Sequence, residues 1–119
     1  MAGEELLLVF TNAVEGRDDE FDRWYDETHV PQVLAVPGVS VAQRYRVGEL
    51  ETPEVEGVPA PPPPAHRYLA IYRLDRDGNE VMAEFGTRLA TGELDLSPDM
   101  DLTTIGLTVW RPHGPERTA

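Results

Sequence analysis

The sequence contains neither cysteine nor lysine, because all ten of its basic residues are arginine. Without cysteine the chain has no disulfide, no thiol nucleophile and no cysteine-bound zinc. Without lysine it has no side chain that forms a Schiff base and no phosphate-binding loop of the type that needs a Gly-Lys pair. These two absences exclude several common classes of enzyme.

Positive charge is also scarce, since 22 acidic residues outnumber the ten arginines and give a net charge of -12. Such a charge disfavours nucleic acids and anionic membrane surfaces as partners, because both are bound by neutralising phosphates. Residues 1–5 are acidic where a secretory signal is basic, and the apolar run Leu6–Phe10 is too short to span a bilayer. We expect a cytoplasmic protein with no nucleic-acid and no membrane partner.

The length of 119 residues predicts one domain, over residues 1–111, followed by a mobile tail over residues 112–119. Residues 48–65 form an insert that is first acidic and then proline-rich, with four consecutive prolines at 61–64. Such a segment cannot pair in a sheet and is expected to be an extended loop. It is either a stiff connector or a ligand for proline-binding modules.

The hydrophobic periodicity predicts the order β-α-β-β-α-β. The first helix is expected to begin near Asp18 and to kink or stop near His29, because Pro31 disfavours helical geometry at the preceding residue. The second is expected to begin at Asp77, which forms a capping box with Glu80, and to end at Gly92. The expected strands cover residues 6–11, 39–47, 67–74 and 103–111.

This order is typical of the ferredoxin-like α+β fold, a four-stranded antiparallel sheet with two helices on one face. In the second strand, Val39, Val41, Gln43, Tyr45 and Val47 alternate with polar residues and are expected to share one face. The sheet face that the helices leave uncovered carries apolar residues, so something must bury it. A homodimer through the sheet faces is the simplest solution.

One segment, residues 20–38, has a recognisable pattern. The aromatic pair Trp24–Tyr25 lies four and five residues before His29, and Pro31 and a Pro-Gly pair at 37–38 follow. This pattern resembles the EthD-like branch of the dimeric α/β-barrel superfamily. The resemblance extends over residues 5–111 and includes Asn12, Gln43–Tyr45 and Arg67–Tyr72, but the proline-rich insert departs from it.

The resemblance implies the dimeric α/β-barrel fold and a pocket between the sheet and the helices, with His29 facing that pocket from the first helix. Similar proteins include cofactor-free cyclases, isomerases and dehydratases, and small monooxygenases without a bound cofactor. No cofactor is therefore expected here. No metal is expected either, because the three histidines are too dispersed for a metal-binding motif.

The candidate catalytic residues are His29, Tyr25 and Asn12. His29 would act as general acid or base, while Tyr25 and Asn12 steady a developing oxyanion. The candidate substrate-binding residues are Trp24, Arg44, Tyr45, Tyr72 and Trp110. Each of these residues also has a purely structural interpretation. His29 would be a core histidine bonded to the kinked backbone, and the aromatic residues would be packed rings. Asn12 would close a turn, and Arg44 would form a salt bridge with the surplus acids.

Three functions remain open from the sequence. The first is a cofactor-independent lyase, cyclase or isomerase that acts on an apolar, oxygenated small molecule. The second is a cofactor-free monooxygenase, in which Asn12 and either Trp24 or Trp110 matter more than His29. The third is a ligand-binding module without catalytic activity.

Overall fold

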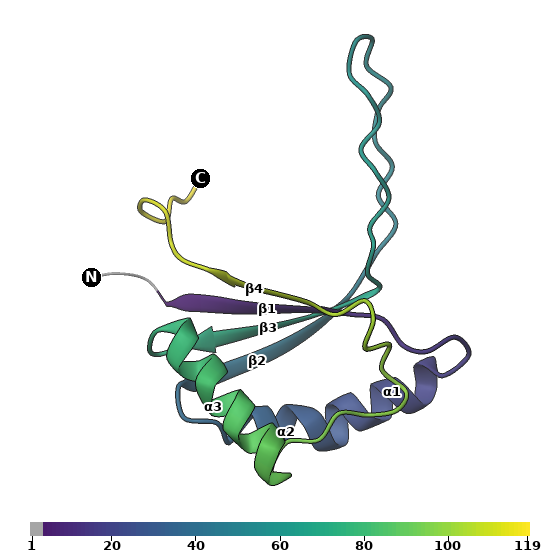
Figure 1. Cartoon of the computed structure of the whole chain (residues 1–119). Helices are drawn as coiled ribbons and strands as arrows, with labels where there is room; N and C mark the ends of the chain where they lie inside the picture. The colour runs from purple at the N-terminus through teal and green to yellow at the C-terminus, as the bar shows by residue number, and fades with distance from the viewer. Residues whose placement is uncertain (1–3) are drawn as a thin grey trace.

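Four antiparallel strands form one sheet in the order β2-β3-β1-β4 (Figure 1). The structure is a computed structural model that describes residues 4–119, so residues 1–3 of the acidic N-terminal segment lie outside the described residues. The strands are β1 (Glu5–Thr11), β2 (Val39–Arg46), β3 (Tyr68–Leu74) and β4 (Gly106–Trp110). This order is the one that the ferredoxin-like fold requires, and it confirms the predicted fold class.

All helices cover one face of this sheet (Figure 1). They are α1 (Asp18–Trp24), the π-helical turn η1 (Tyr25–His29), α2 (Val30–Leu34) and α3 (Gly78–Thr91). The side chain of Asp77 accepts a hydrogen bond from the Asn79 N–H at the start of α3, and Gly92 ends that helix at a φ of 82°. No helix within residues 4–119 has the length and apolar character needed to cross a bilayer.

The core lies between this sheet face and the helices. Alternate residues of the central strands point toward the helices and are buried, while Phe21 and Val81 fill the space from the helical side and are fully inaccessible. Burial of side chains of this size contributes about 1.5–3 kcal/mol each. The inward-facing strand residues are Leu7, Thr11, Tyr68, Ala70, Tyr72 and Leu74.

A bulge in β2 changes the predicted facing of one residue. The alternation placed Val39 on the same face as Val41, and this is wrong. The register shifts between these two residues, so that Val39 pairs with Leu74 and Val41 pairs with Arg73. Val39 therefore points into the core, where it is 9% exposed, whereas Val41 lies on the opposite face of the sheet.

The expected break near His29 is a π-helical turn rather than an end of the helix. Pro31 has no N–H to donate, and the Val30 N–H bonds to the Tyr25 carbonyl five residues earlier. The wider turn takes up one extra residue. Residues spaced four apart gradually rotate around the axis of a regular α-helix. The extra residue of the π-helical turn offsets this rotation, and Phe21, Tyr25 and Val33 all remain buried against the sheet.

The insert of residues 48–65, called the arm below, projects from the end of the sheet where β2 stops and β3 begins (Figure 1). It rises on the side opposite the helices. Its two legs are extended, and the Val58 N–H bonds to the Val55 carbonyl in a turn at the tip, with Gly57 at a φ of 80°. The arm therefore stands beside the uncovered face of the sheet, called the outer face below.

Candidate active site beside His29

A cavity of about 180 Å³ lies between the sheet, α2, α3 and the segment of residues 94–105. His29 and Tyr72 are the lining residues with a titratable polar group, and the remaining lining is apolar. The apolar lining includes Leu7, Val33, Phe85, Leu94, Met100 and Leu107. The cavity is therefore an apolar compartment with two polar side chains, a common composition for a small-molecule site.

Aromatic side chains fix the imidazole of His29. Its ring stacks on the indole of Trp24, with ring centroids 4.6 Å apart and planes 22° apart. The ring of Tyr25 meets it edge-on, with centroids 4.9 Å apart. Nδ1 of His29 is buried and has no hydrogen-bond partner among the described residues, which is unusual for a buried polar atom.

The pKa of His29 is lowered from 6.5 to about 4, mainly because the charged imidazolium would lose its hydration on burial. The positive charge of Arg44 lowers this pKa further, while the backbone of Asp95 acts in the opposite direction. Desolvation is the largest of these three influences. His29 is thus neutral at physiological pH. Because Nδ1 has no hydrogen-bond partner among the described residues, the tautomer that carries its proton on Nε2 presents a bare lone pair on Nδ1.

The hydroxyl groups of Tyr25 and Tyr72 lie 3.2 Å apart in a buried hydrogen bond. Burial raises the pKa of both phenols, so both remain protonated. Tyr72 lines the cavity, and Tyr25 lies behind it and also contacts the His29 ring. Tyr72 can therefore donate its O–H to a ligand in the cavity while its oxygen accepts a hydrogen bond from Tyr25.

Arg44 extends from β2 across the helix side of the sheet. Its guanidinium forms ion pairs of 2.9 Å with Asp22 and with Asp26, and lies 4.4 Å from the centre of the Tyr25 ring. Its side chain is 16% exposed. Arg44 does not line the cavity. It lies over the Tyr25 ring and lowers the pKa of His29 through its charge.

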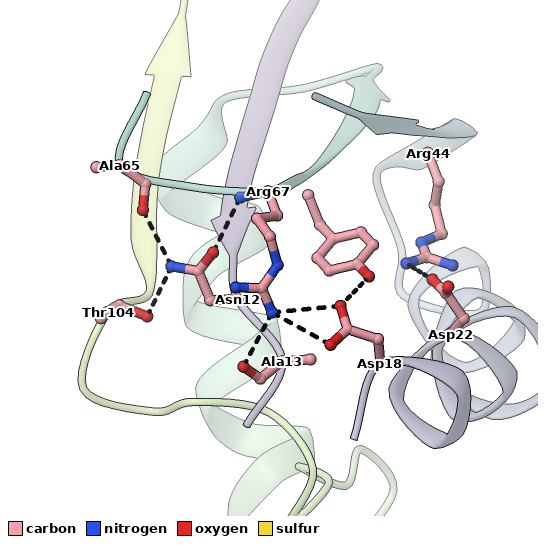
Figure 2. A network of polar contacts seen from close by, with 9 residues as sticks. Asn12, Ala13, Asp18, Asp22, Arg44, Ala65, Arg67 and Thr104 are labelled. Atoms are coloured by element: carbon pink, nitrogen blue, oxygen red, sulfur yellow. Dashed lines mark hydrogen bonds and ion pairs between the residues drawn. The ribbon is translucent and has the colours of Figure 1, made fainter. Parts of the chain in front are cut away.

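Asn12 belongs to a separate polar network at the end of the sheet (Figure 2). Its amide nitrogen donates to the Ala65 carbonyl and to the Thr104 hydroxyl, and its oxygen accepts from the Arg67 N–H. Arg67 in turn pairs with Asp18. The carboxamide of Asn12 is thus fully engaged in joining three chain segments, and it is not part of the His29 cavity.

Tyr45 and Trp110 lie on the outer face, where they are 51% and 56% exposed. The structure therefore brings four of the predicted residues together, namely His29, Tyr25, Trp24 and Tyr72, with Arg44 adjoining them. It places Asn12, Tyr45 and Trp110 elsewhere. The wall formed by residues 94–105 was missed, because that segment is acidic and its buried leucine and methionine have no strand or helix periodicity.

The other histidines do not join this site. His66 is half-buried, and its Nε2 lies 2.6 Å from the Thr104 carbonyl. His113 lies in the exposed tail. Across residues 4–119, no group of histidine and acidic side chains is arranged to hold a metal ion.

The site and the fold together define a ferredoxin-like protein with an apolar cavity beside a neutral histidine. A protein from Shewanella loihica PV-4 described as a candidate monooxygenase shares this fold, with a TM-score of 0.57 and 15% sequence identity over 97% of this chain and 99% of that one. An EthD family protein from Bacillus halodurans C-125 gives a TM-score of 0.49 and 15% identity over 96% of this chain and 99% of that one. No family model matches the chain, and no curated protein matches it.

Proposed function

We propose that the protein is a small-molecule enzyme that works without a cofactor, and that its substrate binds in the cavity beside His29. The single observation that carries the proposal is the buried and unpartnered Nδ1 of His29, a residue that lines a mainly apolar cavity. A buried polar atom without a partner costs stability, roughly 1–3 kcal/mol, unless something satisfies it. A ligand that donates a hydrogen bond to this nitrogen would remove that cost.

The cavity limits the size and polarity of the substrate. An apolar cavity of about 150 Å³ holds benzene, so a cavity of about 180 Å³ suits a substituted ring of similar size. Two polar groups, His29 and Tyr72, face such a molecule. We therefore propose a compact, apolar, oxygenated substrate, with one acidic C–H or O–H group directed at His29 and one oxygen directed at Tyr72.

His29 is proposed as the general base. A neutral imidazole accepts a proton, but a conjugate acid with a pKa of about 4 makes it a weak base in the empty site. It is therefore matched to protons that are already acidic, such as those on carbon between two carbonyl groups. Returning that proton to another atom of the substrate would complete an isomerisation, a cyclisation or an elimination, which are the reaction types proposed here.

Tyr72 is proposed to stabilise the developing oxyanion. The buried hydroxyl of Tyr25 can donate to Tyr72, which leaves the Tyr72 proton free for the substrate oxygen. The sequence assigned this role to Asn12 together with Tyr25. The amide nitrogen and oxygen of Asn12 are hydrogen-bonded outside the cavity, so we assign the stabilisation of the oxyanion to Tyr72 instead.

Proton abstraction can be measured without the natural substrate. A small β-diketone such as acetylacetone, whose acidic C–H lies between two carbonyl groups, exchanges that hydrogen for deuterium in D₂O, and the rate above the buffer background is followed by proton NMR. A positioned general base contributes about 10²- to 10⁴-fold, so His29→Gln should lose nearly all of the protein-dependent rate. Tyr72→Phe should reduce it as well. Leu102→Ala, an exposed substitution outside the cavity, is the matched control and should leave it unchanged.

Equal exchange rates in wild-type protein and His29→Gln would refute the role of His29. Binding of the probe without any exchange above background would favour the ligand-binding module. Nuclear magnetic resonance shifts at Tyr72 and His29 on adding the probe would locate the binding event in either case.

A monooxygenase without a cofactor is the second candidate, and Trp24 stacked on the His29 ring is the observation that favours it. The fold is also shared with a candidate monooxygenase. In that reaction Trp24 would matter more than the basicity of His29. Oxygen consumption that accompanies turnover, and loss of turnover under nitrogen, would support this function, whereas equal turnover without oxygen would exclude it.

A further inference from the structure

The cavity beside His29 has a buried inner end and an outer end at the protein surface. Leu7, Val33 and Tyr72 line the inner end and are at most 2% exposed. Three leucines line the same cavity but are 43–51% exposed, so they lie where it meets the solvent. They are called the rim below. The rim comprises Leu89, Leu96 and Leu107.

The rim brings together side chains that are far apart in the sequence. Leu89 lies near the end of α3, Leu96 in the segment that follows that helix, and Leu107 in the edge strand β4. Figure 1 shows this segment leaving the end of α3, running along the helices and then rising to β4. Single exposed leucines are common on protein surfaces. Three that converge on one opening instead form an apolar patch continuous with the cavity.

The electrostatics of the rim favour an uncharged ligand group. None of the described residues that line the cavity is acidic or an arginine. The whole chain has a net charge of -12, and Asp95 directly precedes Leu96. An anionic group at the rim would therefore meet negative charge without a cation to pair with. The part of a ligand that lies at the rim is accordingly neutral and apolar.

The composition of the rim favours an aliphatic group over an aromatic one. All three of its side chains are leucines, so an aromatic substituent would find no ring to stack on there. The aromatic side chains of the site gather around His29 instead, since Trp24 stacks on the imidazole and Tyr25 meets it edge-on. The site thus has aromatic rings around its reactive group and aliphatic side chains at its opening.

We propose that the substrate carries an alkyl chain, and that the rim binds this chain while the reacting part of the molecule lies beside His29. The inference rests on the proposed function and adds a substituent to the compact, oxygenated group described there. A cavity of about 180 Å³ is filled by a group of about the size of benzene, so a chain attached to that group must pass the rim. The rim leucines are therefore specificity-determining residues that bind the chain and do not touch the reacting atoms.

Binding of 4-alkylphenols measures the contribution of the rim without any turnover. The phenol O–H can donate to Nδ1 of His29, and the alkyl group in the para position points away from that nitrogen. Isothermal titration calorimetry gives the Kd of 4-methylphenol, 4-propylphenol and 4-pentylphenol. Full burial of one CH₂ group lowers Kd about fourfold. Because the rim is half-exposed, we expect about twofold for each CH₂ group, and thus about 16-fold from 4-methylphenol to 4-pentylphenol.

Substitutions in the rim should remove this dependence on chain length. Leu89→Gln combined with Leu107→Thr places polar residues that suit a helix and a strand, and Kd should then no longer fall along the series. Leu96→Ser, outside the helices and strands, should weaken the dependence and tests the rim even where the double variant does not fold. Val41→Thr removes a similarly exposed aliphatic side chain from the outer face and should retain the wild-type series. Far-UV circular dichroism establishes that each variant is folded.

A charged chain end tests the electrostatic part of the proposal. The compound 3-(4-hydroxyphenyl)propanoate has a chain as long as that of 4-propylphenol but ends in a carboxylate, and it should bind at least about tenfold more weakly. Equal binding of the two compounds would overturn the proposal. A Kd that does not vary with chain length would overturn it too, as would a dependence that survives the loss of the rim leucines or disappears in Val41→Thr.

Deuterium exchange of acetylacetone reports separately on the proposed function. Exchange that depends on His29, together with a Kd that is independent of chain length, would refute the alkyl chain and leave the catalytic role of His29 in place. The expected Kd series, together with exchange that does not depend on His29, would support the binding of the chain and refute that catalytic role.

Discussion

The depressed pKa of His29 makes the stability of the protein depend on pH in a defined window. The pKa is 6.5 for an ordinary histidine and about 4 for this one. Below pH 6.5 the His29 side chain of the unfolded chain binds a proton, whereas in the folded chain it binds one only below about pH 4. The contribution of His29 to the free energy of unfolding is therefore complete above pH 6.5 and decreases as the pH falls to about 4.

The size of the effect follows from the same two values. One unit of pKa corresponds to about 1.4 kcal/mol, so the lowered pKa of His29 makes the protein about 3 kcal/mol less stable at pH 4 than at pH 7. A glutamine does not titrate. Relative to His29→Gln, wild-type protein should thus lose about 3 kcal/mol over this range, while the carboxylates that titrate below pH 5 affect both proteins and cancel.

Urea unfolding at pH 7, 6, 5 and 4, followed by circular dichroism, measures this difference. Protein concentration is held constant, because any self-association makes apparent stability depend on concentration. His113→Gln, which removes an exposed histidine from the tail, controls for the loss of a histidine as such. Parallel curves for wild type and His29→Gln between pH 4 and 7 would refute the argument that burial holds this ring neutral.

Four further changes test other parts of the structure. Phe21→Ala removes a fully buried ring and should cost about 3–5 kcal/mol in urea unfolding. Asn12→Ala should lower thermal stability by an amount equivalent to about 1–3 kcal/mol and leave ligand binding in the cavity intact; a loss of binding at unchanged stability would contradict its structural role. Arg44→Gln removes a cation that lowers the pKa of His29, so that pKa, measured by NMR titration, should rise. Gly38→Ala should be strongly destabilising in urea unfolding, because φ is 101° and a Cβ would meet neighbouring side chains at 2.8 Å.

The fold could be predicted from the sequence because each element carries a local signal. The capping residue Asp77, the stop at Gly92 and the alternation in β3 all depend on neighbours along the chain, and the structure contains each of them. Val39 was misplaced because a bulge is a property of strand pairing and leaves no mark in alternation. β4 is shorter than predicted, beginning at Gly106, because β-branched residues before it close a turn instead.

The candidate site was predictable only in part. A shared helical stripe placed Tyr25 and His29 together, since spacing along a helix determines facing. Tyr72 comes from a strand 43 residues further on than His29, and nothing local links its hydroxyl to that of Tyr25. Asn12 is the opposite case. A residue at the end of a strand looks free to bind a substrate, but the three hydrogen-bond partners of Asn12 lie far from it along the chain and have no local signal.

The π-helical turn and two flanking rings orient the imidazole without a hydrogen bond to its Nδ1. A hydrogen bond to Nδ1 would occupy the lone pair that accepts a proton. Here a one-residue offset in the backbone and two flanking rings determine where the ring lies. The orientation of the ring therefore does not depend on a hydrogen bond to Nδ1. Substitutions of His29 that remove this nitrogen can leave the shape of the helix unchanged.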